Sequence, residues 1–172
     1  MNYTVRSMVR RFARRGWAAA LAVGLSLGLA FITASPASAY VGSNFLRNWA
    51  TGRCLDSNAD GDVYTLPCQQ GNDYQTWEPI YLGHTSSDLV QVKNKATGKC
   101  LQYNSYDGRL ITYWCEDTWP KSANQTFYAE GSWTYLTLRN DLSKTCVDSN
   151  AAGSAYFLGC NGGGYQQWRL GY

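Results

Sequence analysis

The strongest constraint on this chain is an internal repeat of about 46 residues. One set of cysteines recurs at intervals of 46 and 46 residues: Cys54, Cys100 and Cys146. A second set follows at intervals of 47 and 45 residues: Cys68, Cys115 and Cys160. Each pair is followed by a Gln-x-aromatic triplet, at 75–77, 125–127 and 166–168. Landmarks that recur in register indicate three copies of one unit, each too small to bury its own apolar face but able to share a core with the others.

Within each unit the sequence has the signals of strands and turns. Short runs rich in β-branched and aromatic residues, such as VYTL at 63–66 and LITYW at 110–114, lie between clusters of Gly, Asn, Asp and Ser. Residues 40–172 contain no stretch that keeps a helical period over three turns. The fold class is therefore predicted to be all-β.

The six cysteines are predicted to form disulfides. Six cysteines allow 15 pairings in principle. Equivalent units should form equivalent disulfides, so the repeat favours pairing of the two cysteines within each unit. Each such bridge closes a loop of about 15 residues and stabilises the fold by roughly 3 kcal/mol. The predicted pairs are Cys54–Cys68, Cys100–Cys115 and Cys146–Cys160.

Residues 1–39 have the features of a secretory signal peptide. Five arginines and no acid precede an apolar run at 17–32, and an Ala-Ser-Ala sequence ends at residue 39. An uncleaved membrane anchor is the alternative, but this run is shorter than the ~20 residues of a spanning helix. We therefore expect a secreted mature chain, residues 40–172, which forms one domain without membrane attachment. Whether export uses the general or the twin-arginine route stays open.

Removing this leader changes the charge of the protein. The whole chain has 15 basic and 12 acidic residues, a net charge of +3, and five of the arginines lie in the leader. The mature chain then keeps 10 basic and 12 acidic residues, a net charge of −2. A nucleic-acid partner is therefore not expected.

The three Gln-x-aromatic ends resemble those of the ricin B-type lectin family, and the resemblance extends over residues 40–172. It implies a β-trefoil, in which three four-stranded units surround a pseudo-threefold axis. It also implies that the aromatic residues Trp77, Phe127 and Trp168 belong to the core and have no role in ligand binding. Free-standing members of this family bind carbohydrate, so glycans or glycoproteins are the expected partners of this chain, acting as a monomer.

Units one and three share a further pattern, D-S-N followed by Tyr, Leu and Tyr-Gln, which resembles the actinohivin-like members of the family. Those members bind the α1,2-linked mannose ends of high-mannose glycans. Carried over by position, the predicted sugar-binding residues of unit three are Asp148, Tyr156, Leu158, Asn161 and Tyr165. Those of unit one are Asp56, Tyr64, Leu66, Gln69 and Tyr74, where Gln69 replaces the expected Asn.

These residue types also suit a saccharide on chemical grounds. A carboxylate accepts hydrogen bonds from two neighbouring hydroxyls, an amide both donates and accepts, and a tyrosine ring covers the apolar face of a sugar. Positions two apart on a strand share a face, so each Tyr-x-Leu pair should form one wall. Unit two departs from the pattern and is predicted to be degenerate, because the equivalent residues are Gln102, Ile111, Tyr113 and Glu116.

Other interpretations remain open. Asp-Ser-Asn segments often serve only as turns. The chain could instead anchor to xylan or another cell-wall polysaccharide. It could also bind protein through exposed aromatic residues, for which the candidates are Trp114, Trp119 and Trp133.

Catalysis and metal binding are not expected. His84 is the single histidine, it is expected in a solvated Gly-Ser-Thr loop, and no nucleophile motif surrounds it. The acids recur by symmetry in separate repeat loops, unlike the asymmetric carboxylate pair of a glycosidase. The segment at 56–61 opens like a calcium-binding EF-hand loop, but Pro67 occupies the position that requires a bidentate Glu. No cofactor is expected.

Overall fold

Short strands joined by tight turns make up nearly all of the structure. The computed structural model describes residues 42–118, 120–132 and 134–171, so the predicted signal peptide lies outside the described residues. These residues include no helix that is long and apolar enough to cross a membrane. The strands are β1 (Asn44–Asn48), β2 (Cys54–Ser57), β3 (Val63–Leu66), β4 (Thr76–His84), β5 (Asp88–Asn94), β6 (Lys99–Tyr103), β7 (Leu110–Trp114), β8 (Phe127–Ser132), β9 (Tyr135–Asn140), β10 (Cys146–Ser149), β11 (Ala155–Leu158) and β12 (Trp168–Leu170). Two 3-10 helices, η2 (Asp73–Gln75) and η3 (Gly164–Gln166), precede β4 and β12.

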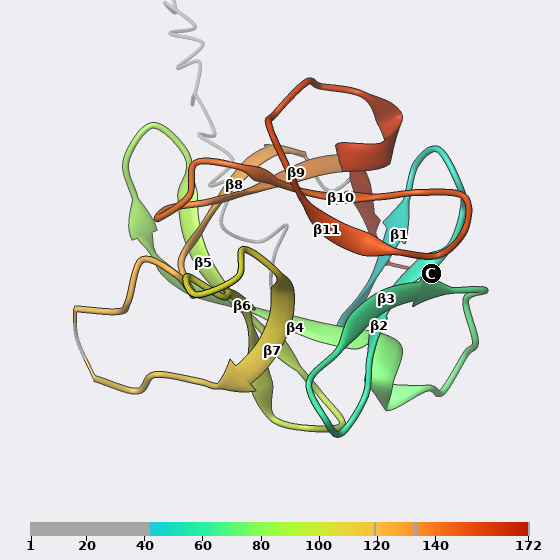
Figure 1. Ribbon diagram of the computed structural model, residues 1–172, viewed down its shortest axis with the longest axis horizontal. Coiled ribbons are helices and arrows are strands. Elements are labelled where there is room, and N and C mark those ends of the chain that lie inside the picture. The colour runs from blue at the N-terminus through green and yellow to red at the C-terminus, as the bar shows by residue number, and fades with distance from the viewer. Residues whose placement is uncertain (1–41, 119, 133, 172) are drawn as a thin grey trace, which may run out of the picture. The chain divides into compact units, whose positions relative to one another are not determined.

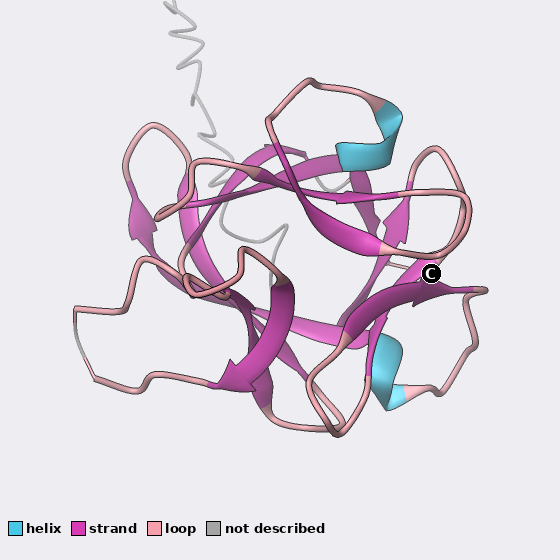
Figure 2. Cartoon of the chain, in the orientation of Figure 1, coloured by secondary structure: helices cyan, strands magenta, loops and turns pink. Residues whose placement is uncertain are grey.

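Six of the strands close into a barrel. Antiparallel pairing runs in a circle through β1, β4, β5, β8, β9 and β12 and returns to β1. The other six form the hairpins β2–β3, β6–β7 and β10–β11, one in each repeat. Figure 1 shows these hairpins arranged around a common centre, and Figure 2 shows that strands dominate every repeat. The predicted all-β fold of three repeats is confirmed, and this architecture is the β-trefoil.

The aromatic residue of each Gln-x-aromatic triplet lies in the shared core. The side chains of Trp77, Phe127 and Trp168 are fully buried, as predicted. The Trp77 indole Nε1 donates to the carbonyl oxygen of Leu55 at 2.9 Å, and that of Trp168 donates to Val147 at 3.1 Å. Each indole therefore ties the barrel of its repeat to the hairpin of the same repeat.

The three predicted disulfides are confirmed. Each joins the first residue of a hairpin, or the second in β6, to a residue just beyond the hairpin. The bonded pairs are Cys54–Cys68, Cys100–Cys115 and Cys146–Cys160.

Gly61 forms a close backbone contact between repeats one and two. Its φ is +103°, and its carbonyl oxygen accepts a hydrogen bond from Thr112 N at 2.8 Å. A Cβ atom at this position would lie 2.7 Å from the Thr112 carbonyl oxygen, a distance that real Cβ contacts do not reach. Only glycine therefore fits here without moving the backbone of β7.

We expect Gly61→Ala to lower the free energy of unfolding by about 2–4 kcal/mol, because backbone strain adds to the clash with Thr112. Gly71→Ala is the control, since Gly71 also has a positive φ, +81°, but faces open space. Urea unfolding of the two variants separates the effect of backbone strain, which both share, from the effect of the clash with Thr112, which only Gly61→Ala has. Equal destabilisation would contradict a role for the Gly61–Thr112 contact.

Candidate functional site

Repeat three contains an open cup on the outer side of its hairpin. The cup has a volume of about 580 Å³. All five residues predicted for unit three line it, together with five neighbouring residues. The lining residues are Asp148, Ser149, Asn150, Ala151, Ala152, Tyr156, Leu158, Asn161, Gly163 and Tyr165.

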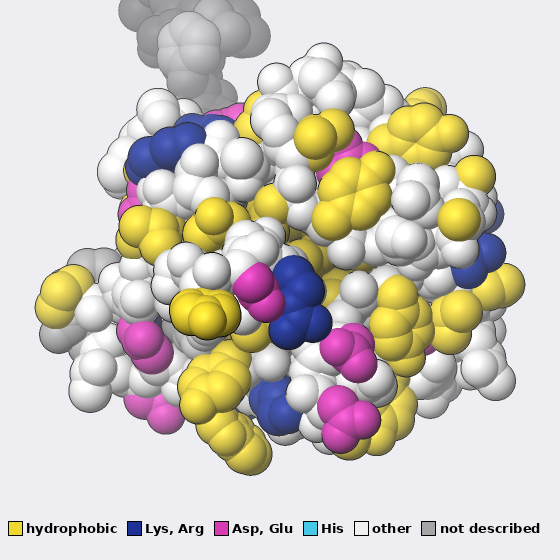
Figure 3. Space-filling view, in the orientation of Figure 1, with side chains coloured by type: hydrophobic (Ala, Val, Ile, Leu, Met, Phe, Trp, Pro, Cys, Tyr) yellow, Lys and Arg dark blue, Asp and Glu magenta, His cyan; other side chains and the backbone are white. Residues whose placement is uncertain are grey.

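The hairpin β10–β11 places the floor and one wall of the cup. Asp148 on β10 pairs directly with Tyr156 on β11, and Leu158 lies two residues further along β11 on the same face. Asp148 is only 3% exposed, whereas Leu158 and Tyr165 are 47% and 46% exposed. The carboxylate therefore lies deep in the cup and the apolar groups lie near its rim. In Figure 3, acidic atoms show between apolar side chains over this hairpin.

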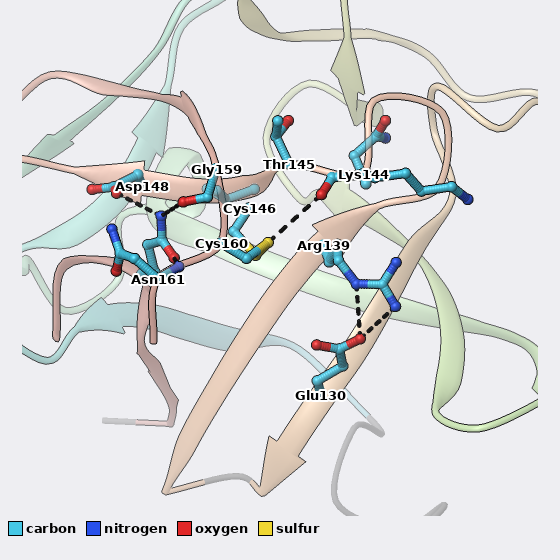
Figure 4. Close-up of a disulfide and its surroundings, with 12 residues drawn as sticks. Glu130, Arg139, Lys144, Thr145, Cys146, Asp148, Gly159, Cys160 and Asn161 are labelled. Carbon is cyan, nitrogen blue, oxygen red and sulfur yellow. Dashed lines mark hydrogen bonds and ion pairs between the residues drawn. A yellow bond between two sulfur atoms is a disulfide. The ribbon is translucent and has the colours of Figure 1, made fainter. Parts of the chain in front are cut away.

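Gln166 holds the polar groups of the cup in place. Its Nε2 donates to Asp148 Oδ2 at 2.9 Å and to the Gly159 carbonyl oxygen at 3.0 Å, and its Oε1 accepts from Asn161 N at 2.8 Å. Figure 4 shows Asp148 and Asn161 on the same side of the Cys146–Cys160 disulfide. A carboxylate has several acceptor sites, so the bond to Oδ2 does not exhaust the capacity of Asp148.

Tyr156 is kept as a neutral phenol beside the carboxylate. Its hydroxyl donates to the Ser149 carbonyl oxygen at 3.3 Å. Partial burial, then the negative charge of Asp148, and then Tyr165 raise the pKa of Tyr156 above its usual value. At neutral pH the cup therefore combines a phenol hydroxyl, a phenol ring and a carboxylate.

Repeat one has the same internal geometry. Asp56 is 2% exposed and its Oδ2 accepts from Gln75 Nε2 at 2.9 Å, while the Tyr64 hydroxyl donates to Ser57 at 3.4 Å. The other predicted residues, Leu66, Gln69 and Tyr74, are exposed. The backbone N of Gln69 donates to Gln75 Oε1 at 2.8 Å, which matches the bond made by Asn161 in repeat three.

Asp56 gives a testable pH dependence. Burial raises the pKa of this carboxyl above its ordinary 3.8, although hydrogen bonds from Gln75 and Ser57 partly oppose the shift. The folded state therefore binds this proton more tightly than the unfolded chain, and the stability due to the proton is lost as the pH rises through the folded pKa. Relative to wild type, Asp56→Asn should gain stability between about pH 3.5 and pH 7. Urea unfolding at both pH values measures this; a relative loss by the variant would contradict it.

Repeat two keeps the glutamine but changes its surroundings. Gln125 Nε2 donates to Gln102 Oε1 at 2.8 Å, and Gln125 Oε1 accepts from Glu116 N at 3.0 Å. The equivalent bond in the other repeats reaches a carboxylate, so this network is built without the charge. The Glu116 carboxylate is engaged by Ser122 N at 2.8 Å, and Tyr113 is 56% exposed.

The sequence did not single out the role of the glutamine in these sites. Gln75, Gln125 and Gln166 are fully buried, and each organises the residues around one hairpin. Their recurrence in every Gln-x-aromatic triplet was the available signal. In the sequence the triplet indicates a structural end motif, whereas the structure shows that its first residue also orients the floor of the cup.

Among residues 42–118, 120–132 and 134–171, no group of three or more His, Cys, Asp and Glu side chains is placed to hold a metal ion. His84, expected in a solvated loop, is instead the last residue of β4. Its Nδ1 lies 2.8 Å from Asp88 Oδ1 at the end of the β4–β5 hairpin. The side chain of His84 is 53% exposed, and it takes no part in either candidate site.

Comparison with protein families gives one match over more than half of the chain. The model of the cytolethal distending toxin A/C domain matches residues 32–130. A cytolethal distending toxin subunit from Campylobacter jejuni is 37% identical to this chain over 57 residues. That alignment covers 33% of this chain and 20% of the relative.

Solved structures share the fold. The designed threefold-symmetric protein ThreeFoil has a TM-score of 0.64 and 24% identity, covering 76% of this chain and 98% of its own. SeviL, solved bound to asialo-GM1 saccharide, has a TM-score of 0.59 and 19% identity, covering 76% of this chain and 96% of its own. Similarity at these identities establishes the β-trefoil architecture.

Proposed function

Since this chain belongs to the cytolethal distending toxin A/C domain family, we propose that it is a non-enzymatic carbohydrate-binding protein that attaches to glycans on cell surfaces. The curated relative is one subunit of that toxin, and SeviL is a saccharide-bound trefoil. The chain spans a fifth of the length of that curated relative, so the activity of the whole toxin is not transferred to it.

The observation that carries this proposal is the composition of the repeat-three cup. A deep carboxylate, Asp148, lies below a rim formed by Leu158 and Tyr165. A monosaccharide presents neighbouring hydroxyls on its edge and C–H groups on its face, which match these two kinds of surface. The open shape of the cup suits the end of a glycan chain.

Within this function we propose α1,2-linked mannose as the terminal sugar. The support is the resemblance of units one and three to actinohivin-like lectins. The cup of repeat three and the matching residues of repeat one would bind, and repeat two would not, because Gln102 replaces the carboxylate. A single shallow site of this kind has an affinity of about −4 to −8 kcal/mol, and two sites gain avidity on a branched glycan.

We further propose that the protein is exported. Three disulfides persist in an oxidising compartment, and free cysteines are absent from the described residues. Residues 1–39 would supply the export signal.

A glycan array probed with the protein tests the function. We expect signal on glycans that end in α1,2-linked mannose, and stronger signal where two such ends occur on one glycan. Signal confined to xylan or other linear polysaccharides would contradict mannose binding and would favour the polysaccharide-anchoring function instead. Absence of signal from every glycan would contradict carbohydrate binding.

A second candidate function is protein binding through repeat two. Trp114 is 65% exposed, Tyr113 is 56% exposed and Tyr106 is 97% exposed, so the altered repeat carries a group of uncovered aromatic side chains. The Campylobacter jejuni relative is named as one subunit of a toxin, which favours assembly with other chains. Trp119 and Trp133, the other candidates for such a surface, lie outside the described residues.

A further inference from the structure

Two arginines face each other where the first and last strands of the barrel meet. Arg47 on β1 and Arg169 on β12 are directly opposite in the antiparallel pairing, and both are exposed. Like charges in this position repel each other. Within the described residues, neither guanidinium has an ion-pair partner.

The equivalent positions of the other repeats are compensated. Between β4 and β5 the basic residue, Lys93, faces Glu78. Between β8 and β9 the equivalent basic residue is Arg139. Its guanidinium lies 4.2 Å from the Tyr128 ring centroid and bonds to Glu130 Oε1 at 2.6 Å. The threefold pattern therefore supplies a carboxylate counter-charge at two of these strand pairs, from Glu78 and Glu130, and leaves two opposed cations at the third.

An aromatic side chain lies beside this third strand pair. Trp49 is 55% exposed, and the Arg169 guanidinium lies 5.3 Å from its ring centroid. The backbone of Trp49 is also held in place, because its N–H donates to the Gln167 carbonyl oxygen at 2.8 Å. A Cβ atom added to Gly164 would lie 3.2 Å from the indole, so this glycine lets the ring lie close to η3.

These groups line a hollow of about 270 Å³, formed by Arg47, Asn48, Trp49, Gly52 and Arg169. Arg47 is oriented by a bond from its Nε to the Gly52 carbonyl oxygen at 3.0 Å, which leaves its terminal nitrogens to other partners. Asn48 is not available to a ligand, because its side chain bonds to Tyr165 and to the turn at residues 50 and 51.

We propose that this hollow binds an acidic saccharide, a sugar whose ring carries a carboxylate. Two guanidiniums offer planar, charged donors to the carboxylate, and the indole offers a flat apolar surface to the sugar ring. The site is separate from the repeat-three cup, whose buried Asp148 disfavours an anion. It does not depend on mannose binding.

NMR titration of the ¹⁵N-labelled protein tests this assignment with three probes: sodium glucuronate, methyl glucoside and sodium sulfate. We expect saturable shifts of the Trp49 indole N–H and the Arg169 Nε–H with glucuronate, and at least tenfold weaker responses to the other two. No saturable response to glucuronate overturns the site. An equal response to sulfate overturns saccharide recognition, since it shows a site for any anion.

Variants give a second measurement. Arg169→Glu should reduce glucuronate affinity at least tenfold without loss of stability, because the new carboxylate would face Arg47 as Glu78 faces Lys93. Arg109→Gln removes an exposed positive charge in repeat two and should leave the affinity unchanged. Asp148→Asn should also leave it unchanged, which separates this site from the mannose site. Unaltered affinity in Arg169→Glu, or equal losses in Arg169→Glu and Arg109→Gln, would overturn the proposal.

Discussion

The double variant Asp56→Asn, Asp148→Asn should lose glycan binding while it keeps its fold. Each carboxylate lies at the floor of its site and accepts a bond from a buried glutamine, Gln75 or Gln166. An asparagine oxygen can accept that bond, as the Gln102 oxygen does in repeat two. The charged acceptor for sugar hydroxyls is lost, however, at about 1.5–3 kcal/mol per hydrogen bond, or roughly ten- to a hundredfold in affinity.

Isothermal titration with a branched mannose glycan measures this effect, and circular dichroism checks the fold. Each single variant should keep one site and lose mainly avidity, whereas the double variant should give no measurable heat. The matched control is Asp60→Asn, Asp117→Asn, which removes the same charge from two exposed positions. Wild-type affinity in the Asp56, Asp148 double variant would contradict the assigned sites.

Trp168→Ala should lower the free energy of unfolding by about 3–5 kcal/mol, the range for deleting a large aromatic side chain from a core. The side chain is fully buried, and its Nε1 bond to the Val147 carbonyl oxygen at 3.1 Å joins β12 to β10. The variant would leave both a cavity and an unsatisfied carbonyl group. That loss is a large part of the stability of a domain of this size.

Trp168→Phe is the control for this variant, because Phe127 occupies the equivalent core position in repeat two. Trp168→Phe should lower the free energy of unfolding by less than half as much as Trp168→Ala, since a phenyl ring fills most of the space and only the hydrogen bond is lost. Urea unfolding measures both variants. A cost for Trp168→Ala below about 1 kcal/mol, the level of a typical surface change, would contradict its place in the shared core.

The repeat carried most of the information about the fold. Because the three units share their landmarks, the spacing of Cys54 and Cys68 could be checked against the other two pairs, and all three disulfides were predicted correctly. The burial of Trp77 and Trp168 was implied by the resemblance to ricin B-type lectins. His84 was assigned to a loop because Gly and Ser residues surround it, but the β4–β5 pairing continues through a bulge to that residue.

The candidate sites were predictable only in part. Asp148, Tyr156 and Asn161 were expected together and do line one cup, but the sequence did not show that the carboxylate lies beneath the surface. Burial depends on how η3 packs over the hairpin, and no local pattern encodes that packing. The opposed pair Arg47 and Arg169 was also hidden, because barrel closure brings together strands more than a hundred residues apart.

The family was also only partly accessible from the sequence. The Gln-x-aromatic triplets led to the trefoil architecture, which is confirmed. They pointed to ricin-type lectins, whereas the matching family model is the cytolethal distending toxin A/C domain. The aromatic residue of the triplet packs in the core of a trefoil. The triplet therefore identifies the fold more directly than it identifies the protein family or the ligand.

The most direct measurement is a crystal structure of the protein with α1,2-mannobiose. The expected result is a disaccharide in the repeat-three cup, with hydroxyls bonded to Asp148 and Asn161 and its C–H face against Tyr165. An equivalent sugar should occupy repeat one beside Asp56. A sugar bound elsewhere with both sites empty, or no bound sugar at millimolar concentration, would contradict the assignment of carbohydrate binding to repeats one and three.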